Sequence, residues 1–383
     1  MNRLRSIWSA AVLAVLCCAV PANPAPAPVD PAIPVVLLKD ISNGQILFAR
    51  EAERRFVPAS VVKTMTAYTA FELVKEGRIR PSTPYLITPD LQDNWYANGS
   101  NMFLRSGDRP TIGELILGAT TVSGNDASVA LAMASVGSLD DWIDLMNANA
   151  RDLGMRNTHF GSVNGLPDEG RTFTSAQDLA LLAEALVTRH PDLYRRYFGH
   201  RTLTWNGITQ RNHDPITGRV RGADGIKTGF TNEAGNTFLG SAERDGRRLV
   251  VVLAGASDAR VRDRTARDLL VWGFSDFILQ VLAAQGSEVG HAKVQNGVVL
   301  KVPLRASEDV TIGVASGSSD EVSTTIRYHG PIAAPIAEGQ HIADLRIEIA
   351  GQPPFDVPLE AAESVAEAGL LQRIRNGFLG FFG

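Results

Sequence analysis

Residues 225–254 read GIKTGFTNEAGNTFLGSAERDGRRLVVVLA and hold three short β-rich runs in direct succession. The runs are 225–230, 236–243 and 248–254. Asp245-Gly246 joins the last two, and an Asp-Gly pair between two such runs is typical of a tight hairpin turn. The stretch therefore predicts three neighbouring strands of an antiparallel sheet.

Two further strands are predicted near the start of the chain. Residues 33–39 and 45–50 are rich in β-branched and other apolar side chains, and Asn43-Gly44 lies between them. Asn-Gly between two apolar runs is a strong hairpin signal. These strands are far from the later three in the sequence, so a sheet that joins both groups would need contacts across the whole domain.

The sequence between these strands predicts helices. The segments 58–76 and 110–200 contain apolar residues at helical spacing, and a long helix is predicted over 260–282. Strands at both ends and helices in the middle predict an α+β domain over residues 28–285, with helices packed on a single antiparallel sheet.

The character of the sequence changes after residue 286. Residues 287–358 are rich in Val and Ile and contain turn residues such as Asn296-Gly297. This pattern predicts a separate, small all-β domain. Residues 359–383 differ again and predict a C-terminal amphipathic segment.

The first residues predict an export signal. Two Arg residues precede an apolar run at 7–20, and small residues follow it. We expect a signal peptide over 1–22, with Ala27 as the other cleavage position, because the run is shorter than the roughly 20 apolar residues of a membrane span. The chain's two cysteines, Cys17 and Cys18, lie inside it. The exported chain would therefore have no disulfide and no cysteine nucleophile.

The composition is that of a globular protein. The chain has 383 residues, of which 44% are hydrophobic and 20% are charged, and its net charge of −4 gives no electrostatic footprint for nucleic acid. The seven His residues show no paired ligand spacing, and no Gly-rich loop follows a strand. We therefore expect neither a metal nor a nucleotide cofactor.

A Ser-x-x-Lys motif occurs once, at Ser60-Val61-Val62-Lys63, where a helix is predicted to start. Positions i and i+3 share one face of a helix, so the Lys63 amine can reach the Ser60 hydroxyl. A serine needs a neighbouring base to become nucleophilic, and a lysine can be that base if its pKa is depressed. Taken alone, the motif would occur by chance in many chains of this length and fits better a helix-capping Ser followed by an exposed Lys.

Two further motifs follow in order. Ser123-Gly124-Asn125 lies between two predicted helices, and Lys227-Thr228-Gly229 lies on the first of the later strands. The cation and hydroxyl of Lys227-Thr228-Gly229 can bind a substrate carboxylate, and Gly229 permits close backbone approach. A second Ser-x-Asn, at 162–164, shows that each motif is weak by itself. Their order and structural contexts together are typical of penicillin-binding proteins and serine β-lactamases.

The chain resembles the D-alanyl-D-alanine carboxypeptidases, low-molecular-mass penicillin-binding proteins of the DacA type (serine peptidase family S11). The resemblance rests on the three motifs and on the segments 123–127, 157–160, 224–229 and 269–274. It covers nearly all of the chain after the signal peptide. It implies a β-lactamase/DD-peptidase-like domain with a five-stranded antiparallel sheet and helices, followed by a β-rich domain.

The resemblance also implies roles for the catalytic residues. Ser60 would attack the carbonyl of the penultimate D-Ala of a peptidoglycan pentapeptide, with Lys63 as its base. Ser123 and Asn125 would position the substrate amide and relay a proton to the leaving D-Ala. β-Lactams would inhibit by acylating Ser60.

The substrate-binding residues follow from the same resemblance. Lys227 and Thr228 would hold the terminal carboxylate, with Gly229 giving room for the backbone. The backbone N–H groups of Ser60 and Phe230 would form the oxyanion hole. Arg262 aligns with an arginine that helps to set the site, although Arg260, Arg264 and Arg267 crowd the same helix.

Three alternatives remain open from the residues. A serine β-lactamase shares the motifs, but no Glu-x-x-Leu-Asn segment for a deacylating water is present and such enzymes lack a second β domain. A DD-endopeptidase that cuts peptidoglycan cross-links would use the same residues. A peptidoglycan-binding scaffold without activity would need none of Ser60, Lys63 and Lys227.

The C-terminal segment predicts membrane contact. On a helix, Leu371, Ile374 and Phe378 would lie on one apolar face, while Arg373 and Arg375 lie mainly off it. Such a helix suits the membrane surface and is too short to span a bilayer. The alternative is a terminal helix packed on the β domain. We expect a peripheral protein on the periplasmic face of the cytoplasmic membrane.

Overall fold

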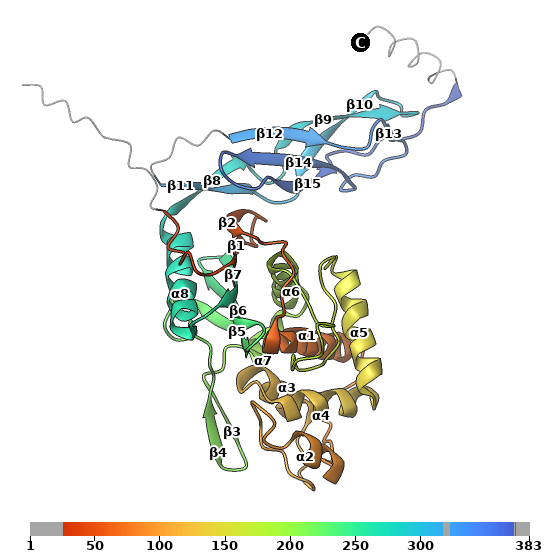
Figure 1. Cartoon of the computed structure of the whole chain (residues 1–383). Helices are drawn as coiled ribbons and strands as arrows, with labels where there is room; N and C mark the ends of the chain where they lie inside the picture. Colours follow the sequence, from red (N-terminus) through yellow and green to blue (C-terminus); the bar gives the residue numbers. More distant parts are fainter. Residues whose placement is uncertain (1–25, 317–321, 371, 373–383) are drawn as a thin grey trace, which may run out of the picture.

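The computed structural model describes residues 26–316, 322–370 and 372 (Figure 1). Five strands form one antiparallel sheet in the order β2-β1-β7-β6-β5. Their bounds are Val35–Asp40 (β1), Ile46–Arg50 (β2), Ala223–Thr231 (β5), Gly235–Arg244 (β6) and Arg247–Ala256 (β7). The predicted single antiparallel sheet and its five strands are therefore confirmed.

Helices cover both faces of this sheet (Figure 1). They are η1 (Ala59–Val61), α1 (Val62–Lys75), α2 (Pro89–Trp95), α3 (Ile112–Thr121), α4 (Asn125–Val136), α5 (Leu139–Asp152), α6 (Ala176–Arg189), α7 (Pro191–Tyr197) and α8 (Ala259–Ser275). On β7, Val250 and Val252 pack into the core with α1 and α3 to α6, whereas Leu249 and Val251 pack toward α8. Alternate side chains of a strand point to opposite faces, so a strand buried on both faces is apolar throughout.

The second domain contains only β-strands in its core. A six-stranded sheet has the order β12-β14-β15-β10-β9-β13, and β8 and β11 form a two-stranded sheet. The bounds are Phe277–Ala283 (β8), Glu288–Gln295 (β9), Lys301–Ala306 (β10), Val310–Ala315 (β11), Val322–Arg327 (β12), Ile332–Ala333 (β13), His341–Ile349 (β14) and Phe355–Ala361 (β15). This confirms the predicted all-β fold, and β15 continues three residues past 358.

The helix predicted over 260–282 is wrong at its C-terminal end. Helix α8 stops at Ser275, and strand β8 begins at Phe277 and pairs with β11 of the second domain. A short apolar run such as 277–283 fits a helix and a strand equally well by periodicity alone. The pairing with β11, which is not visible in a local pattern, decides for the strand.

A hairpin formed by β3 (Thr202–Trp205) and β4 (Ile208–Arg211) was not predicted. It stands away from the sheet at the lower end of Figure 1. Its side chains are exposed or half-buried, but the sequence does carry a hairpin signal that was overlooked: polar and apolar residues alternate over 202–205, and Asn206-Gly207 separates the two strands.

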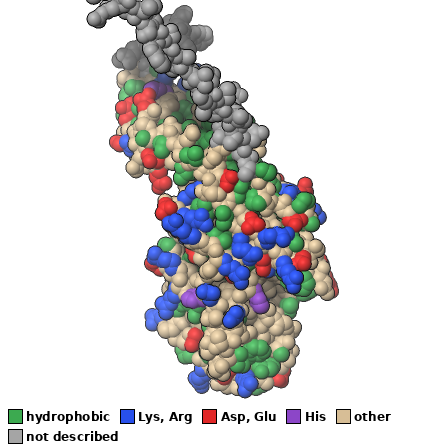
Figure 2. Space-filling model, turned by 90° about the vertical axis from the view of Figure 1, so that its left-hand side faces the viewer, with side chains coloured by type: hydrophobic (Ala, Val, Ile, Leu, Met, Phe, Trp, Pro, Cys, Tyr) green, Lys and Arg blue, Asp and Glu red, His purple; other side chains and the backbone are tan. Residues whose placement is uncertain are grey.

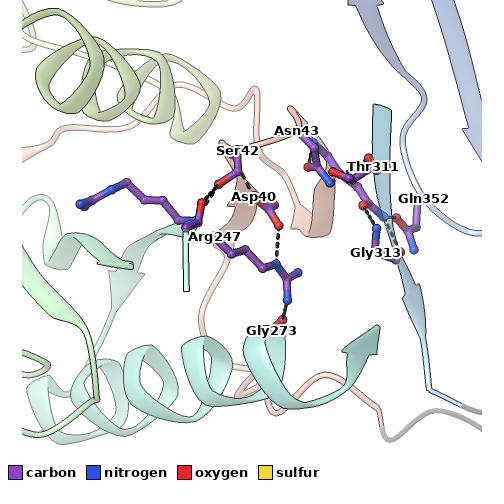
Figure 3. Close-up of polar contacts among 11 residues, drawn as sticks. Asp40, Ser42, Asn43, Arg247, Gly273, Thr311, Gly313 and Gln352 are labelled. Atoms are coloured by element: carbon purple, nitrogen blue, oxygen red, sulfur yellow. Dashed lines mark hydrogen bonds and ion pairs between the residues drawn. The ribbon is translucent and has the colours of Figure 1, made fainter. Parts of the chain in front are cut away.

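The turn between β1 and β2 joins the two domains (Figure 3). The buried Gln45 amide donates to the Gly313 carbonyl at 2.8 Å and to the Gln352 amide oxygen at 2.7 Å, and it accepts from the Gly313 N–H at 2.6 Å. Asn43 donates to the Thr311 carbonyl at 3.1 Å. Beneath this turn, Asp40 and Arg247 form a buried ion pair. These contacts fix the second domain against the edge of the first.

Three sequence predictions lie outside the described residues: the signal peptide at 1–22, its two cysteines, and nearly all of the C-terminal helix. Within the part of the chain that the structure describes, we find no helix that is both long and apolar enough to cross a bilayer.

Candidate active site

The Ser60 hydroxyl lies at the start of the first helix. Ser60 is the middle residue of η1, which leads directly into α1. The Lys63 amine donates to the Ser60 hydroxyl oxygen at 3.0 Å. The predicted i to i+3 contact between the nucleophile and its base is therefore present in the structure.

Burial makes Lys63 a base. Its side chain is fully buried, and burial together with the nearby charge of Lys227 holds the pKa of Lys63 well below its usual value, with Asp126 opposing the shift. The same amine donates to the backbone carbonyl of Asn164 at 2.5 Å. A neutral amine that forms a hydrogen bond to this carbonyl through one N–H still has a lone pair, which can accept the proton of the Ser60 hydroxyl.

Asn164 belongs to the site, although sequence reasoning treated 162–164 only as a second copy of a weak motif. Its carbonyl orients Lys63, and the preceding carbonyl of Val163 accepts from Thr66 of α1 at 2.6 Å. Gly165 has a φ of +79°, and its Cα lies so close to the Ala59 carbonyl that a side chain could not fit. A backbone contact of this kind leaves no signal in the residue types of a motif.

Two non-glycine residues beside the site have positive φ. Ala59 has a φ of 50° and Ser123 a φ of 61°. This left-handed conformation is costly for residues with a Cβ, and it persists where surrounding contacts enforce it, which is common at functional sites. Ser123 is 5% exposed and lies directly before Gly124, the residue that precedes α4.

Asn125 connects the second motif to a neighbouring loop. Its side-chain amide donates to the Asn98 carbonyl at 2.8 Å, and its backbone N–H donates to the Ser100 carbonyl at 2.8 Å. The loop at 95–104 is thus held against the start of α4.

Asp126 holds the same loop and was not predicted to have a role. Its carboxylate accepts from the backbone N–H groups of Met102 at 2.8 Å and Leu104 at 3.0 Å. Burial raises the pKa of Asp126, and these N–H donors oppose the shift. An acidic residue is so common in the first turn of a helix that nothing in the sequence singles out Asp126.

The third motif lies on β5, beside the nucleophile. A side chain on Gly229 would place its Cβ 2.6 Å from the Pro58 carbonyl and 3.1 Å from the Ser60 nitrogen, so only glycine lets the strand approach this closely. The Lys227 amine donates to the Thr228 carbonyl at 2.8 Å. Phe230, the next residue, is 59% exposed.

The environment of Lys227 lowers the pKa of its amine. Burial, and then the charge of Arg262, lowers the pKa of Lys227 to about 7, while Asp214 opposes the shift. Arg262 is 6% exposed on α8 and is bound by the Asp263 carboxylate. His213 belongs to the same group of charges, since burial, Lys227 and Arg262 lower its pKa. The sequence singled out Arg262 but not His213.

The arrangement suits acyl transfer by a serine. It combines a hydroxyl, a buried amine that can accept its proton and a second cation that can attract a carboxylate. Within the described residues, no group of three His, Cys, Asp or Glu side chains is placed to hold a metal ion.

Comparisons with known proteins agree with this chemistry. A family model described as D-alanyl-D-alanine carboxypeptidase matches residues 25–258, and one described as penicillin-binding protein 5, C-terminal domain, matches residues 277–367. The D-alanyl-D-alanine carboxypeptidase DacD of Salmonella typhimurium is 33% identical over 359 residues, which are 92% of each chain.

Solved structures are similar as well. The crystal structure of penicillin-binding protein 5 from Haemophilus influenzae has a TM-score of 0.76 and 29% identity, and the match covers 89% of this chain and 99% of that one. Penicillin-binding protein D2 of Listeria monocytogenes, in a cefotaxime-bound form, has a TM-score of 0.57 and 28% identity, with 64% of this chain and 98% of that one covered.

Proposed function

The chain belongs to the peptidase S11 family of D-alanyl-D-alanine carboxypeptidases and is a serine-type DD-carboxypeptidase, and from this premise we propose which residue carries out each step of the reaction. The substrate is a peptidoglycan pentapeptide stem, from which the terminal D-alanine is removed. The observation that carries this assignment of roles is the contact between the Ser60 hydroxyl and the buried Lys63 amine.

In the first half-reaction, Ser60 attacks the carbonyl of the penultimate D-Ala while Lys63 takes the hydroxyl proton. The backbone N–H groups of Ser60 and Phe230 stabilise the negative charge that develops on the carbonyl oxygen. The amide C–N bond then breaks, and D-alanine leaves with a proton relayed through Ser123. Asn125 orients the substrate amide. Water hydrolyses the resulting ester and restores the Ser60 hydroxyl.

The cations hold the end of the substrate. Lys227 and Thr228 bind the terminal carboxylate, and Arg262 adds to the positive potential there. A β-lactam carries a carboxylate and a strained amide, so the same groups would bind it and Ser60 would become acylated. The cefotaxime-bound relative supports this proposal.

Mass spectrometry of a muropeptide with a pentapeptide stem tests the function. Incubation with the purified protein should shorten the stem by one alanine. Cleavage of cross-linked dimers alone, with the pentapeptide left intact, would contradict the carboxypeptidase assignment.

We expect activity to fall as the pH rises through about 7. The pKa of Lys227 is lowered to about 7, and its protonated form binds the carboxylate. Above pH 7, the fraction of enzyme with a protonated Lys227 therefore falls about tenfold for each pH unit. kcat/KM for a carboxylate-bearing peptide, which reports the free enzyme, should show this decline. Lys227→Arg should remove it because arginine stays charged. An unchanged alkaline limb in Lys227→Arg would assign the titration to another group.

We propose the localisation of the protein from the sequences of its two terminal segments. Residues 1–22 would direct export, and the segment 370–383 would lie in the headgroup region of the cytoplasmic membrane with its aromatic side chains in the acyl boundary. The absence of acidic residues from 370–383 favours anionic lipid.

Deleting 370–383 should release the protein from anionic liposomes. The described part of the chain retains the active site, so hydrolysis of small peptides should stay within about twofold of wild type. Co-sedimentation with vesicles of anionic and of neutral lipid measures the effect. Equal sedimentation of the shortened and full-length chains would disprove the anchor.

A further inference from the structure

The hydroxyl of Thr237 reaches the turn that carries the nucleophile. Thr237 lies on β6, where it is paired with Gly229 of β5. Its side chain is buried, with 1% of the residue exposed, and its hydroxyl donates to the backbone carbonyl of Pro58 at 2.9 Å. Neither the three motifs nor the roles proposed for the reaction include this residue.

The sheet leaves room for this hydrogen bond at Gly229. A Cβ on Gly229 would overlap the Thr237 hydroxyl oxygen and would lie 2.6 Å from the Pro58 carbonyl oxygen. The pairing of β6 with β7 also shifts its register at Thr237, between Asn236 and Phe238. Irregularities of this kind next to an active site commonly re-aim a side chain. The Thr237 hydroxyl therefore passes β5 at a residue without a side chain and connects β6 directly to the turn.

The Pro58 carbonyl precedes a residue in an unfavourable conformation. Ala59 has a φ of 50°, a left-handed value that is costly for a residue with a Cβ and persists where surrounding contacts enforce it. Two contacts flank this residue. Thr237 holds the carbonyl that precedes Ala59, and Gly165 lies against the carbonyl of Ala59 itself. The backbone of the turn is therefore held on both sides of the strained residue.

The orientation of Ser60 depends on this turn. Ser60 is the middle residue of η1, so its N–H and its hydroxyl move with the turn. The two N–H groups proposed for the oxyanion hole come from different elements, Ser60 of η1 and Phe230 of β5. Thr237 links η1 to the sheet opposite the residue that precedes Phe230. The hydrogen bond thus lies where the two N–H groups must converge on one oxygen atom.

We propose that Thr237 is a positioning residue for the acylation of Ser60. Its hydroxyl fixes the separation between η1 and the sheet, and so holds the N–H groups of Ser60 and Phe230 in the geometry that stabilises the transition state. Thr237 acts through the Pro58 carbonyl and takes no part in proton transfer. The inference rests on the proposed function, which assigns the nucleophile and the oxyanion hole.

The step that Thr237 favours is the formation of the tetrahedral intermediate. A bond forms between the Ser60 oxygen and the carbonyl carbon, the hydroxyl proton moves to Lys63, and an electron pair of the C=O bond moves onto the carbonyl oxygen. This negative charge develops in the transition state and is absent from the bound substrate. A displaced N–H donor should therefore lower the rate constant of acylation and leave the binding of the unreacted ligand nearly unchanged.

Thr237→Val and Thr237→Ser separate the hydroxyl from the rest of the side chain. Valine has a similar shape but places a methyl group against the Pro58 carbonyl. A carbon–oxygen contact needs about 3.3–3.6 Å, so the turn should move by about 0.5 Å from its present separation of 2.9 Å. We expect the acylation rate constant of Thr237→Val with a chromogenic β-lactam to fall about 10- to 100-fold.

Thr237→Ser keeps the hydroxyl and should acylate within about threefold of wild type, while saturation kinetics should give a dissociation constant of the initial complex within about threefold in both variants. If Thr237→Val does not fold, Thr237→Ala removes the same hydroxyl without adding a methyl group. It should also show a slower acylation with unchanged initial binding.

Ser241→Ala is the matched control. Ser241 lies on the same strand, is fully buried, and its hydroxyl accepts a hydrogen bond from Arg248 at 2.7 Å. Its loss should lower the melting temperature and leave the acylation rate constant at the wild-type value. These substitutions are buried and uncharged, so they leave unchanged the Lys and Arg side chains that gather on one face of the molecule (Figure 2). A slower reaction could not come from a weaker attraction of the anionic β-lactam.

Three outcomes would overturn the inference. Acylation of Thr237→Val at the wild-type rate would show that the hydroxyl is not needed, and an equal loss in Thr237→Ser would assign the effect to the packing of the side chain. A loss confined to the dissociation constant would indicate a role in recognition. A wild type that forms no adduct at Ser60 would instead disprove the proposed function, and the inference with it.

Discussion

Ser60→Ala should form no covalent adduct with penicillin and should lose about 10³-fold or more of its peptidase activity. The hydroxyl lies 3.0 Å from the Lys63 amine, and loss of a catalytic nucleophile costs as much as loss of the whole catalytic set. Intact-mass spectrometry after incubation with penicillin measures the adduct. The wild type should gain the mass of one penicillin molecule.

The exposed Ser106 provides the control, because Ser106→Ala removes a hydroxyl outside the site. This variant should be acylated as wild type. A penicillin adduct on Ser60→Ala, or a wild-type adduct that maps to another serine, would show that the nucleophile has been assigned wrongly.

Lys63→Met should slow acylation by about 10²- to 10⁴-fold, the usual contribution of a general base. Methionine keeps an unbranched side chain in this fully buried position, so the fold is disturbed less than by alanine. The rate of Ser60 acylation by a chromogenic β-lactam measures the effect. A melting temperature close to wild type shows that the loss is chemical.

Lys75→Met is the matched control, since Lys75 is an exposed lysine in the last turn of the same helix. It should acylate at the wild-type rate. If Lys63→Met also did so, the proton of Ser60 would have to go to a different base.

The sequence predicted the main sheet because its strands carry local signals. Strand β7 is apolar throughout since both of its faces are buried, and Asn43-Gly44 and Asp245-Gly246 mark the turns beside it. Strand β8 has no such signal. Residues 277–283 are apolar but mostly exposed, so only their pairing with β11 distinguishes them from a continuation of α8.

The motifs gave the chemical groups of the site but not its electrostatics. Ser60 and Lys63 meet because i and i+3 share a helix face, which is a local property. The pKa of Lys63 falls because the side chain is buried and because Lys227 from β5 lies nearby. Neither condition can be read from a four-residue motif, since an exposed lysine at the same spacing would remain charged.

The sequence by itself determined the five strands of the main sheet, the three motifs and the family to which they belong, because these depend on residue type and spacing along the chain. The tertiary structure alone decided which distant groups act on them. The Asn164 carbonyl reaches Lys63 from 101 residues away, and Asp126 holds the backbone of Met102 and Leu104. Such contacts use backbone atoms that every residue has, so only the folding of the chain selects them.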